Sequence, residues 1–420
     1  MPATKSKRAP REALLPRQQI AQLAGLRPVH HAFAWFRKHE EALVQLQLEL
    51  AAIPAPPFGE AARSAWFKQK FQGLGLATQV DEAGNVIAAR AGADSELPAV
   101  ALIAHMDTVF PEGTPLKYRS EGGKLYGPGI SDNGSGLVAL LALAESLRWT
   151  DVRNRADIIF VCTVGEEGEG NLRGVRHLFA NGEWRQKIGY AIIVDGAGTE
   201  TIVSQALGSR RFEITVRGKG GHSWSDFGEP NPIAVLARAI CDLYKIEVST
   251  TARKKSAYNV GVIEGGTSVN SIPEAARMRV DIRSESQSEL ERLEHELRAA
   301  VARAVRSVRA PSKAEAAGKP ALQCEIESIG ERPAAELASG ARILQVMRAV
   351  DAHLGIDSRL HCSSTDANIP LALGKEALSI GAGGSGGGAH TLKEWYDPAG
   401  RDLGLKRILL ATLAIAGVED

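Results

Sequence analysis

Short apolar runs separated by helix-like segments dominate the first half of the chain. The runs typical of buried strands are Ala99 to Ala104, Ile158 to Val164 and Ala191 to Val194, each followed by charged or glycine-rich residues. Apolar residues at helix-compatible spacing occupy Glu40 to Ala52 and the region around Leu137 to Leu147. Alternating strands and helices predict a largely parallel α/β sheet, whose ligand sites lie beyond the carboxyl ends of its strands.

The pattern changes near Arg211 and returns near Ala338. Between these points the sequence predicts an alternating strand, a long helix, a surface loop and a last strand, at Phe212 to Val216, Leu290 to Val305, Pro311 to Pro320 and Leu322 to Ile326. Beyond Ala338 a helix and a further strand are expected at Ile343 to Leu354 and Ala377 to Ile380. We therefore expect an α+β unit at residues 209–332, inserted into a discontinuous first domain of residues 1–208 and 333–420.

Composition narrows the class of protein. The 420 residues are 44% hydrophobic and 24% charged, which predicts a folded, water-soluble chain. Because 50 Lys and Arg oppose 49 Asp and Glu, no overall field favours nucleic acid or an anionic membrane. The four cysteines contain no Cys-x-x-Cys pair, which favours a reducing cytoplasm. Residues 1–19 are basic without a following apolar segment, and a frayed tail is expected there.

The candidate chemistry gathers where the predicted strands end. His105 and Asp107 close the first buried run, and they offer a metal-binding imidazole with a carboxylate near enough to orient it. Asp132 lies in a glycine-rich turn before an apolar helix, where capping of that helix by Asp132 or Ser131 is an equal alternative to metal binding.

Three further sites repeat the arrangement. Glu166 and Glu167 follow the second buried run, Asp195 ends the third, and His390 follows a glycine run near the C-terminus. A solvated acidic loop, a turn-forming aspartate and a surface histidine are the alternatives for the individual sites. Taken together, two histidines and several carboxylates are typical of a borderline metal that takes nitrogen and oxygen ligands.

In this combination of motifs, the chain resembles the dizinc amidohydrolases that include aminoacylase, acetylornithine deacetylase, carboxypeptidase G and peptidase T. The similarity runs from about Leu43 to the C-terminus. It implies a zinc-exopeptidase-like three-layer α/β/α catalytic domain, with the inserted α+β unit as a lid and dimerisation domain. It also implies two Zn²⁺ per chain, with Co²⁺ or Mn²⁺ as substitutes, and a homodimer formed through the inserted domain.

The resemblance also implies a role for each residue of the metal centre. His105 and His390 would each bind one metal and Asp132 would bridge both, with Glu167 and Asp195 as the remaining ligands. Glu166 would be the general base, and Asp107 would orient His105. The aspartate at position 195 is similar to the peptidase T and aminoacylase branches, since other branches have a glutamate there.

Three residues of the inserted unit also match the motifs of these hydrolases. The segments Gly218 to Ser223, Ser268 to Pro273 and Asp281 to Arg283 carry the resemblance. His222 is similar to a histidine that reaches a neighbouring active site and polarises the scissile carbonyl. Asn270 and Arg283 would contact substrate, although a core or surface role for Arg283 is an alternative.

The expected activity is zinc-dependent hydrolysis of a peptide bond by a peptidase T-like exopeptidase that acts on small peptides. Glu166 would activate a metal-associated water for attack on the amide carbonyl. One alternative is an N-acyl amino acid deacylase with the same centre. A non-catalytic binding protein on the same fold is a second alternative, which the complete set of expected metal-centre residues disfavours.

Overall fold

A mixed sheet of nine strands organises most of the computed structural model, which describes residues 16–251, 255–308 and 322–419. In spatial order the strands are β1 (Ala77–Val80), β2 (Val86–Arg90), β6 (Ile158–Thr163), β3 (Ala99–His105), β7 (Ile188–Val194), β17 (Glu376–Ile380), β8 (Thr201–Ala206) and β15 (Ala335–Glu336), and β16 (Arg359–Ser363) pairs with β8. Every residue of β3 and β6 is buried, which explains why both strands are apolar runs without alternation.

The sheet is mixed, with a parallel centre. Strands β6, β3, β7 and β17 run parallel to one another, and β16 runs parallel to β8. The pairs β1 with β2, β2 with β6, β17 with β8, and β8 with β15 are antiparallel. The prediction of a largely parallel sheet is therefore wrong for the edges. The physical reason is visible at β1 and β2, because the short turn from Asp81 to Asn85 can join only antiparallel strands.

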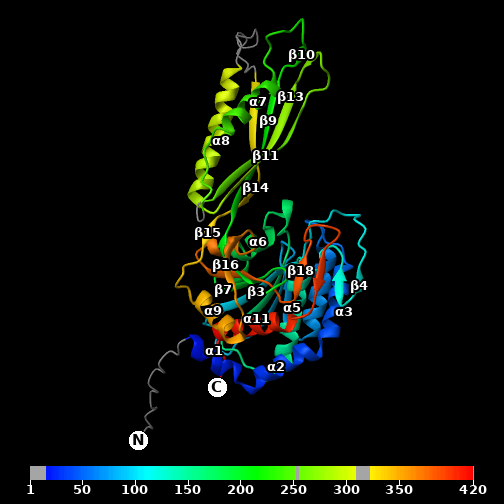
Figure 1. Ribbon diagram of the computed structural model, residues 1–420, viewed down its shortest axis with the longest axis vertical. Helices are drawn as coiled ribbons and strands as arrows, with labels where there is room; N and C mark the ends of the chain where they lie inside the picture. Colours follow the sequence, from blue (N-terminus) through cyan, green and yellow to red (C-terminus); the bar gives the residue numbers. More distant parts are fainter. Residues whose placement is uncertain (1–15, 252–254, 309–321, 420) are drawn as a thin grey trace.

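Helices cover both faces of this sheet (Figure 1). On one face lie α4 (Ala61–Gly73), α5 (Gly134–Arg148), α9 (Arg342–Leu354) and α11 (Arg401–Ala416), with α1 (Pro16–Ala24), α2 (Arg27–Lys38) and α3 (Glu40–Ala51) packed against them. On the other face lie α6 (Arg173–Ala180) and α10 (Asn368–Ala372), with the short 3-10 helices η1 (Gly168–Gly170) and η2 (Glu183–Arg185) nearby in the chain. The predicted three-layer α/β/α arrangement is confirmed.

The start of the described chain differs from the expected tail. Residues 1–15 lie outside the described residues, but residues 16–19 form the first turn of α1. Ile20 and Leu23 of this helix are buried where it contacts α9 and α11, and the Gln19 side chain donates a hydrogen bond to the Ala414 carbonyl oxygen at 2.8 Å. Burial of these apolar side chains accounts for the helix, so the prediction of a frayed segment is wrong from residue 16 onward.

A second sheet, with its own hydrophobic core, stands beyond the first (Figure 1). Its strands are antiparallel in the order β11 (Ser256–Gly265), β13 (Ala275–Ser284), β9 (Gly208–Gly218) and β14 (Leu322–Arg332), and α7 (Pro232–Leu243) and α8 (Gln287–Ser307) pack on it. The expected loop from Pro311 to Pro320 lies outside the described residues. The elements from β9 to β14 are consistent with the inserted unit predicted at residues 209–332, whose limits stay a prediction.

Two small sheets complete the fold. The antiparallel pair of β10 (Gly221–His222) and β12 (Ser271–Ile272) lies at the end of the second sheet farthest from the first (Figure 1). The other sheet has the order β18 (Ser385–Gly387), β19 (Trp395–Asp397), β5 (Lys124–Tyr126) and β4 (Arg119–Glu121). This second small sheet joins the segment around His390 to the segment that leads into the Asp132 turn. Within the described ranges, no helix combines the length and apolar character needed to cross a bilayer.

Candidate metal centre

His105 is the last residue of β3 and is only 2% exposed. Its Nδ1 lies 3.0 Å from the backbone oxygen of Asp107, and donation to that carbonyl leaves Nε2 with a lone pair for a cation. Nε2 lies 3.2 Å from Asp132 Oδ1 and 3.7 Å from Asp195 Oδ1. These three side chains form one group that can hold a metal ion.

A second group forms around His390, in the loop between β18 and β19. Its Nε2 lies 3.2 Å from Asp132 Oδ2 and 3.0 Å from Glu167 Oε1. The two oxygens of Asp132 therefore face different histidines, one in each group. A carboxylate placed in this way can be shared by two cations.

The charge balance of the centre fits divalent cations. Burial by itself lowers the pKa of His105, but the carboxylates of Asp107, Asp132 and Asp195 outweigh it and raise the pKa well above its usual value. Hydrogen bonds to Asp132 and Glu167 raise the pKa of His390 to about 10. Without a metal, both imidazoles are thus driven to hold a proton that balances the carboxylates. Nitrogen and oxygen ligands with excess negative charge are a suitable donor set for Zn²⁺.

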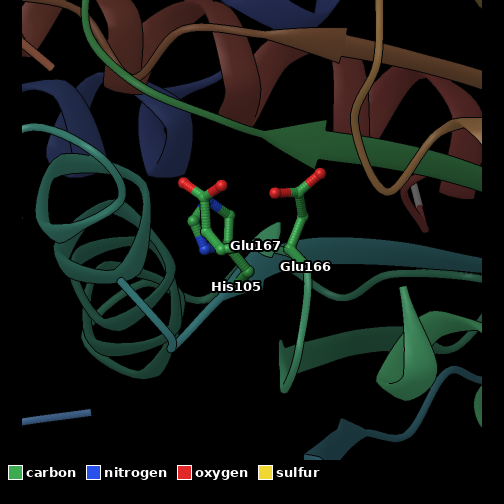
Figure 2. A group of neighbouring side chains, drawn as sticks. All are labelled: His105, Glu166 and Glu167. Atoms are coloured by element: carbon green, nitrogen blue, oxygen red, sulfur yellow. The ribbon is translucent and has the colours of Figure 1, made fainter. Parts of the chain in front are cut away.

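Glu166 and Glu167 come from the loop that follows β6, and Figure 2 shows both side chains beside His105. The three can also be grouped around one cation, so distance alone does not separate a ligand from a base. Glu166 differs because Arg332 Nη1 donates to its Oε1 at 2.8 Å. Burial raises the pKa of Glu166 well above its usual value, although the charge of Arg332 opposes the shift.

The carboxylate of Asp107 supports the glutamate pair more directly than it supports His105. It is completely buried, and its Oδ1 and Oδ2 accept hydrogen bonds from the backbone N–H groups of Glu166 at 3.0 Å and Glu167 at 2.7 Å. Its Oδ1 lies 3.7 Å from His105 Nδ1, too far for a hydrogen bond. A side chain two residues beyond the end of β3 therefore fixes the loop after β6, which is the neighbouring strand.

The turn before α5 contradicts the capping alternative for Asp132 and Ser131. The residue that caps the helix is Asn133, whose Oδ1 accepts from the Gly136 N–H at 3.1 Å. The same Oδ1 accepts from the Gly196 N–H at 3.1 Å, and Asn133 Nδ2 donates to the Val194 carbonyl at 2.9 Å. Capping by Asn133 leaves the Asp132 carboxylate free to face the two histidines. It also joins the turn to the strand end that carries Asp195.

Sequence reasoning missed two supporting residues. Glu394 is buried, and its carboxylate accepts hydrogen bonds of 2.8 Å from the N–H groups of Gly129, Ser131 and Asp132. Arg332 is 8% exposed and donates a hydrogen bond to the Glu166 carboxylate. The only sequence signals were an acidic residue four positions after His390 and a basic residue at the predicted limit of the inserted unit, and neither pattern is specific.

The three site residues predicted in the inserted unit lie in different places. Arg283 lines the cavity of about 660 Å³ above the metal groups. Its Nε donates to Asp281 Oδ2 at 2.8 Å, and Arg211, on the same cavity wall, donates from Nε to Asp281 Oδ1 at 3.1 Å. His222 and Asn270 do not line this cavity, and β10, which carries His222, lies at the far end of the inserted unit (Figure 1).

The chain is similar to known hydrolases. The sequence profile of peptidase family M20/M25/M40 matches residues 101–412. Succinyl-diaminopimelate desuccinylase of Burkholderia mallei is 31% identical over 158 residues, which are 34% of this chain and 41% of that protein. Carboxypeptidase G2 of a Pseudomonas species is 28% identical over 186 residues, 43% of each chain. The match thus spans less than half the length of these curated relatives.

Solved structures extend the likeness to most of the fold. Aminopeptidase PepT of Bacillus cereus superimposes with a TM-score of 0.72 at 21% identity, over 90% of this chain and 99% of that chain. A Staphylococcus aureus tripeptidase gives 0.72 at 20% identity, over 90% and 98%. At these identities the likeness concerns the fold. Because the family profile covers well over half of the sequence, the chain belongs to peptidase family M20/M25/M40 and is a hydrolase.

Proposed function

We propose that the chain is a peptidase T-like dizinc exopeptidase that removes residues from small peptides. The observation that carries the two-metal hydrolysis in this proposal is the position of Asp132, with each carboxylate oxygen beside a different histidine. His105 and Asp195 would hold one metal, and His390 and Glu167 the other. When bound, two zinc ions polarise an amide carbonyl and lower the pKa of a water molecule, and Co²⁺ or Mn²⁺ can take their place.

The proton transfers fall to Glu166. Burial raises the pKa of Glu166 well above its usual value, and this favours a carboxyl group that both accepts and releases a proton during the reaction. Glu166 takes the proton of the attacking water and then gives it to the leaving amine. Asp107 holds the loop that carries Glu166, and so keeps the base beside the ligand group.

The inserted unit contributes to substrate binding in this proposal. Arg283 lines the cavity and, held by Asp281, presents a cation to the substrate. His222 and Asn270 lie away from this cavity and would serve that of a partner chain, with His222 polarising the scissile carbonyl. The unit would therefore be a lid and the contact surface of a homodimer. The molecular mass in solution, measured by light scattering, tests this arrangement.

An N-acyl amino acid deacylase is the second candidate. Sequence similarity to a desuccinylase and to carboxypeptidase G2 favours it, although each match covers less than half of the relative. Both candidates use the same metal ligands and the same base. Only the group on the acyl side of the scissile amide differs, so the substrate profile separates them.

A substrate panel with metal analysis tests the function. We expect about two zinc ions per chain and faster amine release from di- and tripeptides than from N-acyl amino acids. Glu166→Gln should abolish turnover while the zinc content stays unchanged. Glu169→Gln is the matched control, because Glu169 is an exposed carboxylate in the same loop. Turnover by Glu166→Gln would refute the assignment of the base, and faster release from the N-acyl substrates would favour the deacylase.

We also place the enzyme in the cytoplasm. All four cysteines, Cys162, Cys241, Cys324 and Cys362, are free thiols, which suits a reducing compartment. Fractionation of the source cells with an antibody against the protein tests this location.

A further inference from the structure

Arg332, the last residue of β14, binds the loop of the proposed base at two points. Its Nη1 donates to Glu166 Oε1 at 2.8 Å and to Ser364 Oγ at 2.9 Å. Its Nη2 donates to the backbone oxygen of Glu166. A planar guanidinium that holds both the side chain and the main chain of one residue fixes the direction of that residue's carboxylate.

Two further hydrogen bonds hold this loop and the adjoining helix α6 against β14. The backbone N–H of Glu331 donates to Asn171 Oδ1 at 3.0 Å, and Arg176 donates from Nη2 to the Glu331 carbonyl. The loop after β6 is thus held on one side by Asp107, which follows β3, and on the other side by β14 of the inserted unit. Of the β14 contacts described here, only those of Arg332 involve Glu166 itself.

The two oxygens of the Glu166 carboxylate have different surroundings. Oε1 accepts the charged hydrogen bond from Arg332. Figure 2 shows one oxygen of Glu166 turned toward Glu167 and His105 and the other turned away from them. With one oxygen anchored, the other can exchange a proton without losing its direction. Without the anchor, the side chain regains rotamers that point away from the ligand group.

We infer that Arg332 is a positioning residue that orients Glu166 and ties the orientation of the base to the placement of the inserted unit. This inference rests on the proposed role of Glu166 as the base. Arg332 acts through Glu166 and has no proton-transfer step of its own. A change at Arg332 should therefore slow the chemical step while leaving metal and substrate binding nearly intact.

The test compares Arg332→Ala and Arg332→Lys with Arg176→Ala on the substrate that the wild-type enzyme cleaves fastest in the panel. Arg176→Ala is the matched control, because it removes a guanidinium that ties the loop to β14 without contacting the Glu166 side chain. We expect Arg332→Ala to lower kcat about 100-fold, with KM within about threefold of wild type and unchanged zinc content. Arg332→Lys should recover part of the loss.

Addition of guanidinium ion separates positioning from a structural role. Arg332 lines the open cavity, so millimolar guanidinium can enter the space that the alanine variant leaves. We expect guanidinium to raise kcat of Arg332→Ala at least tenfold and to leave Arg176→Ala unchanged. Wild-type kcat in Arg332→Ala, or a loss that guanidinium does not reverse, would overturn the inference.

A crystal structure of Arg332→Ala gives a second test of the positioning role, and this test does not depend on enzymatic activity. The Glu166 carboxylate should leave its position beside Glu167, and an unmoved carboxylate would contradict the positioning role. Failure of the proposed base has a different signature, since Glu166→Gln would then remain active, and failure of the peptidase activity would appear in the substrate panel. An inactive Glu166→Gln beside a fully active Arg332→Ala would refute only the role of Arg332.

Discussion

Replacement of Asp107 by asparagine removes one negative charge from beneath the proposed metal centre and changes little else in volume. The Asp107 carboxylate is completely buried, and it accepts from the N–H groups of Glu166 at 3.0 Å and Glu167 at 2.7 Å. Asparagine offers one oxygen and one NH₂ group in the same place. One of the two N–H groups would therefore face another donor.

The size of the effect follows from these contacts. Loss of one hydrogen bond to a buried charged group costs about 1.5–3 kcal/mol. The loop can relieve the clash only by moving Glu166 or Glu167, and Glu167 is a proposed ligand. At about 1.4 kcal/mol for each factor of ten, zinc affinity should fall about 10- to 100-fold.

The assay is competition for zinc between the protein and a coloured chelator. Asp81→Asn is the matched control, because Asp81 Oδ1 also accepts backbone N–H groups, from Ala83, Gly84 and Asn85, in the turn between β1 and β2. That carboxylate is not part of a metal group, so its loss should leave zinc affinity unchanged. Wild-type zinc affinity in Asp107→Asn, or an equal loss in Asp81→Asn, would refute the reasoning.

Three other predictions concern titration, stability and metal removal. In the metal-free protein, burial raises the pKa of Asp366 from 3.8 to about 6, so ionisation of this group costs stability as pH rises through that interval. Asp366→Asn should therefore raise the melting temperature of the metal-free protein more at pH ~8 than at pH ~4, and equal shifts would contradict this sign. Asp351→Ala should lower the free energy of unfolding in urea by about 3–5 kcal/mol, because it leaves the buried Arg407 guanidinium without its carboxylate partner. That carboxylate accepts from Arg407 Nε at 2.6 Å and from Nη2 at 2.7 Å. A loss under about 1 kcal/mol would argue against this reasoning. Chelation should abolish hydrolysis and lower the melting temperature, and added zinc should reverse both; activity that survives complete metal removal would exclude the dizinc proposal.

The sequence by itself indicated that the candidate ligands lie at the ends of buried strands. The apolar runs became β3, β6 and β7, and His105, Glu166 and Asp195 lie at or just beyond their carboxyl ends. These three strands are parallel neighbours, so their carboxyl ends share one edge. Burial of an apolar strand is a local property of the sequence, which is why this part of the site was predictable.

Two elements of the second sheet and its helices were predictable for the same reason. Alternation of apolar and polar residues in β9 and helical spacing in α8 are local signals, and both elements formed where they were expected. The antiparallel edges of the main sheet were not expected, because strand direction depends on connections that composition does not specify. Likewise, α1 packs into the core only because α9 and α11 lie against it, and these helices are far from it in the sequence.

Only the tertiary structure decided how the distant segments meet. Asp132 faces both histidines because Asn133 caps α5 and because Glu394, from the loop of His390, binds the backbone of the turn. Arg332 reaches Glu166 because the end of β14 passes the loop that follows β6. Each contact joins residues far apart in the chain, and its geometry is set by the packing of whole elements. No local pattern of residue types encodes such a distance.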